Sequence, residues 1–182
     1  MEISNTGFNG LKIINCFTAK DSRGKFVKVL NNNFLIEKKI NFSIKEVYFS
    51  LSKKNVIRGM HFQLPPMQHK KIVFVSHGEI TDVVIDLRKK SKTFGKIFFV
   101  NLSEENNKAI LIPEGFAHGF KVLSHIAIVH YLQTSCYSKE HDSGILWSSI
   151  PFSWDVKQPI VSERDKNFIK LEEFINSNHN KF

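Results

Sequence analysis

Short runs of Val, Ile and Phe recur along this chain between turn signals, and this pattern constrains the fold more than any other feature. The runs cover residues 44–50, 71–75, 80–87, 97–102, 109–112, 120–123 and 126–133. Turn signals such as His77-Gly78 and Pro113-Glu114-Gly115 lie between them. Many short strands at this spacing predict an all-β sandwich or barrel.

Two segments have the pattern of helices, one at residues 33–39 and one at residues 166–176. In the second, Phe168, Leu171, Phe174 and Ile175 would form one apolar stripe. The 182 residues suit one domain, 1–182, with a single core. We expect the tail, residues 177–182, to fray.

The chain has no apolar run long enough to span a bilayer, and its first residues lack the basic and apolar regions of a signal peptide. We therefore expect a cytoplasmic protein with no membrane partner. The two cysteines, Cys16 and Cys136, are far apart in the sequence. This spacing favours two buried thiols over a disulfide or a zinc site.

The formal net charge is +9, from 26 Lys and Arg against 17 Asp and Glu, so nucleic acid has to be considered as a partner. Many of the lysines stand in short clusters such as Lys38-Lys39, Lys53-Lys54 and Lys89-Lys90. No basic helix or aromatic-rich RNA motif accompanies them. We interpret most of this charge as a solvated surface and expect no nucleic-acid partner, while a smaller share attracts an anionic metabolite.

The segment Val56–Gln63 combines a permanent cation, Arg58, with a titratable base, His61. On a flat strand these two side chains would lie on opposite faces. Gly59 permits a bulge that directs both into one cavity, where they would hold an anionic substrate and remove a proton from it. The alternative is a strand end with a satisfied histidine, and these residues alone leave both readings open.

Six segments belong together. They are Asp21-Ser22-Arg23-Gly24, Val56–Gln63, Asp82–Arg88, Ser91–Gly95, Ile112–Phe120 and Ser162–Asp165. In this order and spacing they resemble the dTDP-4-dehydrorhamnose 3,5-epimerase family, from about residue 8 to residue 168. The most specific motifs are RGxHFQ, which contains His61, and IPxGFAHGF, which contains His118.

The resemblance implies an all-β, cupin-type jelly-roll barrel with a short C-terminal helix that works as a homodimer, without metal or cofactor. The sequence agrees about the metal. A metal-binding cupin usually has an H-x-H pair and a carboxylate, but here His61 is followed by Phe62 and Gln63.

The resemblance also implies an isomerase. Its substrate would be a nucleotide-linked 4-keto-6-deoxy sugar in deoxysugar biosynthesis for surface polysaccharide, such as lipopolysaccharide or capsule. The C4 ketone acidifies the hydrogens on C3 and C5, so removing one gives an enolate and reprotonation on the opposite face inverts that carbon. The sequence leaves open whether C3, C5 or both are inverted.

Four residues match the catalytic positions of the family. His61 matches the base, Asp165 its carboxylate partner, Tyr131 the proton donor, and Lys71 the lysine that stabilises the enolate oxygen. Without the resemblance, Asp165 would be read as the N-cap of the C-terminal helix and Tyr131 as a core aromatic.

Further residues match the contacts with the substrate. Arg23 and Arg58 match the diphosphate contacts, His118 contacts the sugar, and Tyr137 lies nearer the nucleotide. Three more positions complete the predicted binding set, Gln63, Asp142 and Arg164. Asp82 and Asp86 are expected to brace the barrel, with a place at the edge of the site as the alternative.

The departures from the family cluster at the nucleotide end. Lys28 stands at a glutamate position, Glu46 and Tyr48 replace a Gln-x-Asn pair, and His69 replaces a glutamine. Reversing a charge alters hydrogen-bond recognition of a base or sugar. We therefore expect Lys28, Glu46 and Tyr48 to change the choice of nucleotide, with CDP- or GDP-linked sugars, including heptoses, as alternatives to dTDP.

Two other functions compete with the epimerase. A 3,4-ketoisomerase acting on a related nucleotide sugar would have histidine where Gln63 stands. A non-catalytic sugar-nucleotide binder would be expected to lose His61, Tyr131 or Asp165, and all three are present.

Overall fold

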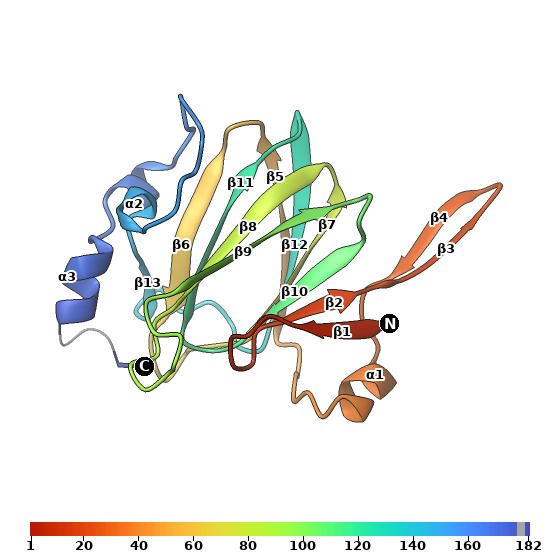
Figure 1. Ribbon diagram of the computed structural model, residues 1–182, viewed down its shortest axis with the longest axis horizontal. Helices are drawn as coiled ribbons and strands as arrows, with labels where there is room; N and C mark the ends of the chain where they lie inside the picture. The colour runs from red at the N-terminus through yellow and green to blue at the C-terminus, as the bar shows by residue number, and fades with distance from the viewer. Residues whose placement is uncertain (178–180) are drawn as a thin grey trace.

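Two antiparallel sheets face each other in the computed structural model, which describes residues 1–177 and 181–182 (Figure 1). The first sheet has the order β1 (Glu2–Asn5), β2 (Lys12–Asn15), β10 (Lys108–Ile112), β7 (Lys71–His77), β12 (Ile126–Gln133) and β5 (Glu46–Lys53). The second has the order β13 (Asp142–Gly144), β6 (Ile57–Gln63), β11 (Phe116–Val122), β8 (Glu79–Asp86) and β9 (Ile97–Ser103). The predicted all-β jelly-roll class is confirmed.

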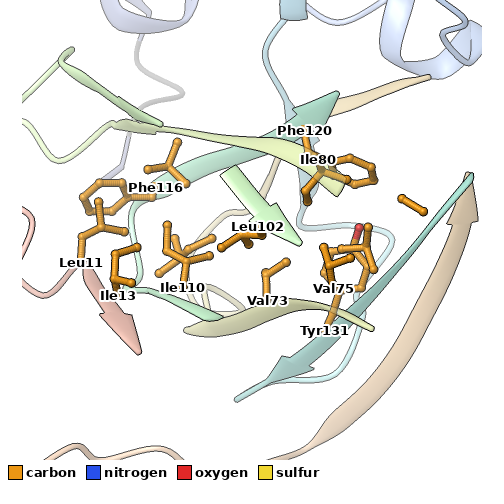
Figure 2. Packing of buried hydrophobic residues seen from close by; sticks show 14 of the residues in the cluster. Leu11, Ile13, Val73, Val75, Ile80, Leu102, Ile110, Phe116, Phe120 and Tyr131 are labelled. Atoms are coloured by element: carbon orange, nitrogen blue, oxygen red, sulfur yellow. The ribbon is translucent and has the colours of Figure 1, made fainter. Parts of the chain in front are cut away.

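Alternation along the strands divides the side chains between the core and the outside. In β12, Ala127, Val129, Tyr131 and Gln133 are buried, while the residues between them are half-buried. The buried residues of both sheets meet in one core between the layers (Figure 2). Tyr131 belongs to this core and also lines the pocket described below, so the functional site borders the core directly.

A second apolar cluster covers the five-stranded sheet with the C-terminal part of the chain. Trp154, Leu171 and Phe174 pack with residues of β6 and β8 such as Met60 and Val83. The covering segment contains the 3₁₀ helix η1 (Trp147–Ser149) and the helices α2 (Glu163–Lys166) and α3 (Leu171–Asn176). This packing holds α2 beside β6, where the site is built (Figure 1).

The C-terminal helix expected at residues 166–176 is wrong in its extent, because the chain forms α2 and α3 with a break between them. In the break, Ile169 forms a bridge with Ile145, and the Ile169 carbonyl accepts the Leu146 N–H at 2.8 Å. The Phe168 ring, expected on the helical stripe, lies against Gly144 instead. Tertiary pairing therefore interrupts the helical pattern. Of the tail expected to fray, residues 178–180 lie outside the described residues, and the Phe182 ring packs on Phe62.

The sequence pattern missed the N-terminal strands β1 and β2 and the hairpin β3 (Phe17–Asp21) and β4 (Gly24–Lys28). The helix expected at 33–39 is present as α1 (Asn32–Glu37). In the described part of the chain, the strands of the hairpin pair only with each other, and the hairpin projects away from the two sheets (Figure 1).

Both cysteines are free, but only Cys16 is partly buried, whereas Cys136 is exposed. The prediction of two buried thiols is therefore wrong for Cys136, which follows the end of β12. Burial raises the pKa of the Cys16 thiol to about 11, so this thiol stays protonated at neutral pH. No helix within the described residues is long and apolar enough to cross a membrane.

Candidate functional site

A pocket of about 400 Å³ lies between the two sheets and brings together eleven of the fourteen predicted site residues. These eleven are Glu46, Tyr48, Arg58, His61, Gln63, Lys71, His118, Tyr131, Tyr137, Asp142 and Arg164. Sequence reasoning left five other lining residues out of the predicted site, which are Ser50, Phe62, His69, Phe120 and Gln133, although it noted His69 as a departure from the family. Strand alternation carried the signal for Gln133, since it shares a face of β12 with Tyr131. His69 lies in the loop before β7, where alternation gives no signal.

The bulge predicted at Gly59 is present and explains how Arg58 and His61 reach one cavity. In the pairing with β11, His61 lies opposite His118 and Arg58 lies opposite Phe120, so β6 contains one extra residue in this interval. Gly59 has φ +136°, and a Cβ there would lie 2.5 Å from the Cα of Gly119. Only glycine fits this close contact between β6 and β11.

His61 and Asp165 form a hydrogen-bonded pair at the pocket. The Nε2 atom of His61 lies 2.8 Å from Oδ1 of Asp165, and Oδ2 of Asp165 accepts the Gly59 N–H at 3.0 Å. The alternative role for Asp165, the helix N-cap, is wrong, because Ser162 is the N-cap of α2 and accepts the Asp165 N–H. The carboxylate is thereby left to orient the imidazole.

The environment sets the charges of this pair. Burial lowers the pKa of His61 below its ordinary value, although the bond to Asp165 and its charge oppose the shift. Burial acts to raise the pKa of Asp165, but the bonds and charge of His61 and the Gly59 N–H outweigh it, and the pKa is lowered. An ionised Asp165 can only accept, so Nε2 of His61 carries the hydrogen and Nδ1 is left as a free base.

A second imidazole–carboxylate pair lies beside the first. Nε2 of His118 lies 2.7 Å from Oδ2 of Asp82, and both side chains are buried. The strand pairing places His118 directly opposite His61. Asp82 reaches the pocket through its bond to His118, and its role at the edge of the site stays a prediction. Asp86 braces the loop after β8 through hydrogen bonds with Arg88, Ser91 and Thr93.

Lys71 supplies a buried cation to the pocket. Burial lowers its pKa to about 8, while the charges of Asp82 and Asp142 oppose the shift. The ammonium is therefore charged at pH 7. Its Nζ donates to the His61 carbonyl at 3.4 Å, which is a long contact that leaves it available to an anionic oxygen in the pocket.

The two candidate tyrosines lie in different surroundings. Tyr131 is buried, its hydroxyl is 3.3 Å from the Ser50 hydroxyl, and its ring meets the edge of His118. Burial raises the pKa of Tyr131, so it remains a neutral acid. Tyr137 is 58% exposed, and its hydroxyl lies 3.5 Å from Asp142. Burial and position favour Tyr131 for chemistry inside the pocket.

Charged residues surround the mouth of the pocket. Arg164 forms an ion pair with Asp142 at 2.6 Å, and Glu46 accepts the Tyr137 N–H at 2.9 Å. The Arg58 guanidinium donates to the Ser52 hydroxyl at 3.0 Å. Arg58 and Arg164 therefore offer cations where an anionic ligand would enter.

One corner of the pocket is held by amide and imidazole groups. The Gln63 side chain donates to the carbonyls of Met67 and Cys136 and accepts the Ser138 N–H at 2.6 Å, so its function is to hold these loops. Beside it, His69 is buried, and burial lowers its pKa to about 3. Its Nε2 atom has no hydrogen-bond partner in the described part of the chain.

Arg23 and Lys28 do not join the pocket within one chain. Arg23 is at the tip of the projecting hairpin, where its side chain is 87% exposed and pairs with Asp21. Lys28, at the other end of β4, lies beside Phe17 in a separate shallow groove. The ligand contacts expected of Arg23 and Lys28 therefore remain predictions, because the hairpin would have to reach a pocket to make them.

In residues 1–177 and 181–182, no three side chains of His, Cys, Asp or Glu converge as a group that would hold a metal ion. The groups that do converge are a neutral imidazole, a buried phenol and a charged amine. A base, an acid and a cation around one cavity suit the removal of a proton next to a carbonyl group, with the cation stabilising the developing oxyanion.

Comparisons with known proteins point to the same chemistry. Residues 5–173 match a family model described as dTDP-4-dehydrorhamnose 3,5-epimerase. An enzyme of this name from Shigella flexneri is 43% identical, over 85% of this chain and 89% of its own. Such an enzyme from Bacillus anthracis, solved with TDP and PPi bound, has a TM-score of 0.90 at 36% identity, over 93% of this chain and 99% of its own. A dTDP-6-deoxy-D-glucose-3,5-epimerase from Legionella pneumophila, in complex with dTDP-4-keto-L-rhamnose, has a TM-score of 0.89 at 35% identity, over 94% and 93% of the two chains.

Replacing Asp165 by Asn is expected to lower the pKa of His61 further, because the substitution removes the negative charge that favours the protonated imidazole. NMR titration of the chain labelled at histidine measures this pKa directly. Glu163→Gln is the matched control, since Glu163 is on the same helix but is exposed and pairs with Lys166. An unchanged or higher His61 pKa in Asp165→Asn would contradict the assigned pair.

Proposed function

Because the chain belongs to the dTDP-4-dehydrorhamnose 3,5-epimerase family, we propose that it inverts C3, C5 or both in a nucleotide-linked 4-keto-6-deoxy sugar. The observation that carries this proposal is the pair of His61 and Asp165 at a pocket that also contains Lys71 and Tyr131. The family places the enzyme among the isomerases of deoxysugar biosynthesis. Surface polysaccharide is the destination that we propose for the sugar.

The first step is removal of a proton from the carbon next to the ketone. Nδ1 of His61 takes the proton, and the electron pair of the C–H bond moves toward the C4 oxygen to form an enolate. Asp165 keeps the imidazole in the required tautomer and stabilises its protonated form through the bond to Nε2.

Lys71 and Tyr131 would complete the inversion. The charged Lys71 ammonium stabilises the negative C4 oxygen, and burial strengthens this interaction. The Tyr131 hydroxyl then donates a proton to the carbon from the face opposite His61. Solvent afterwards takes the proton from His61 and returns one to the phenolate, so both groups are restored. The carbon regains a hydrogen, so the net reaction changes only its configuration.

The role of Gln63 supports epimerisation over 3,4-ketoisomerisation. The ketoisomerase alternative would place a titratable imidazole at this position, but here the side chain is a neutral amide that holds Met67, Cys136 and Ser138. A non-catalytic binder would have no need for the oriented base and buried acid at the pocket.

The decisive experiment is turnover in deuterated water of one 4-keto-6-deoxy sugar carried on dTDP, CDP and GDP. We expect NMR and mass spectrometry to find deuterium at C3, C5 or both, together with inversion. The names of the relatives favour dTDP, whereas Lys28, Glu46 and Tyr48 predict changed nucleoside discrimination. Each polar group left unpaired costs about 1–3 kcal/mol, so two mismatches separate the carriers by about two to four orders of magnitude in kcat/KM at the upper end.

The control for this experiment is His61→Asn, which keeps a polar side chain but removes the base. It is expected to lose about two to four orders of magnitude in exchange at both carbons with little change in binding. Near-normal exchange in this variant, or no exchange with any carrier in the wild type, would overturn the proposed function. A clear preference for dTDP would show only that the three substitutions do not redirect the site.

Tyr131→Phe and Tyr137→Phe test which tyrosine is the acid. Tyr131→Phe keeps the buried ring and deletes its proton, so we expect deuterium exchange to continue in part while inversion falls by about two orders of magnitude or more. Tyr137→Phe, at the pocket mouth, is expected to raise mainly KM. The reversed pair of phenotypes in a deuterium-exchange assay would assign the acid to Tyr137.

We infer that the enzyme is a homodimer, because β5, the outermost strand of the six-stranded sheet in the described part of the chain, presents apolar side chains at the surface. Val47, Phe49 and Leu51 alternate along β5, and all three are more than half exposed. The projecting hairpin exposes Phe17 and Phe26 as well. Three exposed apolar side chains in a row on an edge strand are typical of an interface rather than of a monomer.

The partner subunit would also explain where Arg23 and Lys28 act. Their hairpin lies away from the pocket of its own chain, so a two-fold arrangement that covers β5 would allow it to reach the neighbouring pocket. Each site would then combine His61 from one subunit with Arg23 from the other.

Mixed dimers test this arrangement. Arg23→Ala and His61→Asn subunits are expected to be weakly active alone, but random mixing would give one intact site in each heterodimer and restore about a quarter of the wild-type rate. No recovery after unfolding and refolding the mixture would place Arg23 in its own chain's site or outside both. Analytical ultracentrifugation serves as the control, with a species of twice the 21.0 kDa chain mass expected.

A further inference from the structure

The ring of Tyr48 lies against that of Tyr131, the predicted proton donor. On the antiparallel strands β5 and β12, Tyr48 is paired directly with Tyr131. The two rings are stacked, with centroids 4.6 Å apart and an interplanar angle of 16°. The sequence assigned Tyr48 to the nucleoside end of the site, but its ring contacts Tyr131, the residue that we propose as the proton donor.

The Tyr131 ring is packed in the core, but hydrogen bonds do little to fix the direction of its hydroxyl. Within the described residues, its hydrogen-bond partner is the Ser50 hydroxyl, at a distance of 3.3 Å, which is long for a bond between two hydroxyl groups. The ring also meets the edge of His118, at a centroid distance of 6.3 Å. The second torsion of a tyrosine side chain is broad, so the plane of the ring depends on what packs against its faces.

Tyr48 is itself held in place, although it is 41% exposed. Its hydroxyl accepts a hydrogen bond of 2.5 Å from the Gln133 side chain, which is buried. Gln133 follows Tyr131 by two residues on β12, so one strand supplies both the acid and the group that anchors its neighbour. The Tyr48 ring is thus fixed at its tip and along its face.

We propose that Tyr48 is a positioning residue that holds the plane of the Tyr131 ring, so that the enolate is protonated from the Tyr131 face and the carbon inverts. This role rests on the proposed function, because it presupposes the enolate and the acid role of Tyr131. A proton transfer of this kind requires the donor within hydrogen-bond reach of the carbon, and small misplacements reduce it strongly. When Tyr131 is misplaced, protonated His61 exchanges its proton with the solvent and returns a solvent hydrogen to the original face, so the carbon exchanges without inversion.

This role differs in its kinetic effect from that of a residue that only forms part of the wall of the pocket and contacts the substrate there, which we call a substrate-binding wall. A wall would act on KM and leave the fate of the enolate unchanged. A positioning residue changes the ratio of solvent exchange to inversion, since both reactions begin with the same proton removal by His61 but only inversion requires Tyr131.

The test compares Tyr48→Leu, which removes the stacked ring, with Tyr48→Phe, which keeps the ring and deletes the hydroxyl. In deuterated water we expect Tyr48→Leu to raise the ratio of exchange to inversion by about threefold to tenfold, the scale of one stacked aromatic pair. In Tyr48→Phe the same ratio is expected to rise less, to within about twofold of the wild-type ratio, because the ring still stacks although its bond to Gln133 is lost. Tyr131→Phe provides the upper limit of the ratio, and thermal unfolding confirms that each variant is folded. Tyr48→Asn is a second ring-deleting variant if Tyr48→Leu is unstable.

Each outcome decides the proposal. An unchanged ratio with a raised KM in both ring-deleting variants would make Tyr48 a substrate-binding wall and overturn the positioning role. Equal changes in Tyr48→Phe and Tyr48→Leu would assign the effect to the hydroxyl and overturn the role of the stacked ring. A wild-type enzyme with neither exchange nor inversion would remove the proposed function as well, whereas wild-type turnover with unchanged ratios in the variants would remove only the role of Tyr48.

Discussion

One carboxylate connects the architecture of this protein to its chemistry. Asp165 accepts the backbone N–H of Gly59 with one oxygen and meets the His61 imidazole with the other. The first bond holds the bulge that directs both Arg58 and His61 into the pocket, and the second sets the tautomer of the base. Asp165 is positioned in turn by the Ser162 cap of α2 and by the apolar cluster that fixes the C-terminal segment on the five-stranded sheet. The geometry of the site therefore depends on packing outside the barrel.

Much of the fold and the inner site could be predicted from the sequence, because both depend on local patterns. Alternating apolar residues marked most of the long strands, and a glycine between Arg58 and His61 indicated the bulge. The motif resemblance gathered residues that the structure places around one cavity. These predictions succeed because strand alternation fixes which side chains share a face, whatever the rest of the chain does.

The remaining features depend on contacts between distant segments. The helix expected at 166–176 is interrupted because Ile169 pairs with Ile145, which no periodicity records. Arg23 and Lys28 are near the barrel in sequence, but their hairpin projects from it, and sequence does not show where a hairpin points. Likewise, Tyr48 stacks on Tyr131 because the register of β5 against β12 places them opposite each other. Register depends on how two strands pair, so the residue pattern of one strand does not predict which residue of the other lies opposite.

The base and its carboxylate partner are 104 residues apart in the chain. At a synthesis rate of about 5–20 residues per second, Asp165 leaves the ribosome about 5–20 seconds after His61. All the strands in the described residues precede Asp165 along the chain, so the strands that line the cavity are synthesised while the imidazole still lacks its carboxylate partner. A translation product that ends before α2 would lack the carboxylate that orients His61, and it would expose the apolar residues of β6 and β8 that Leu171 and Phe174 cover in the complete fold.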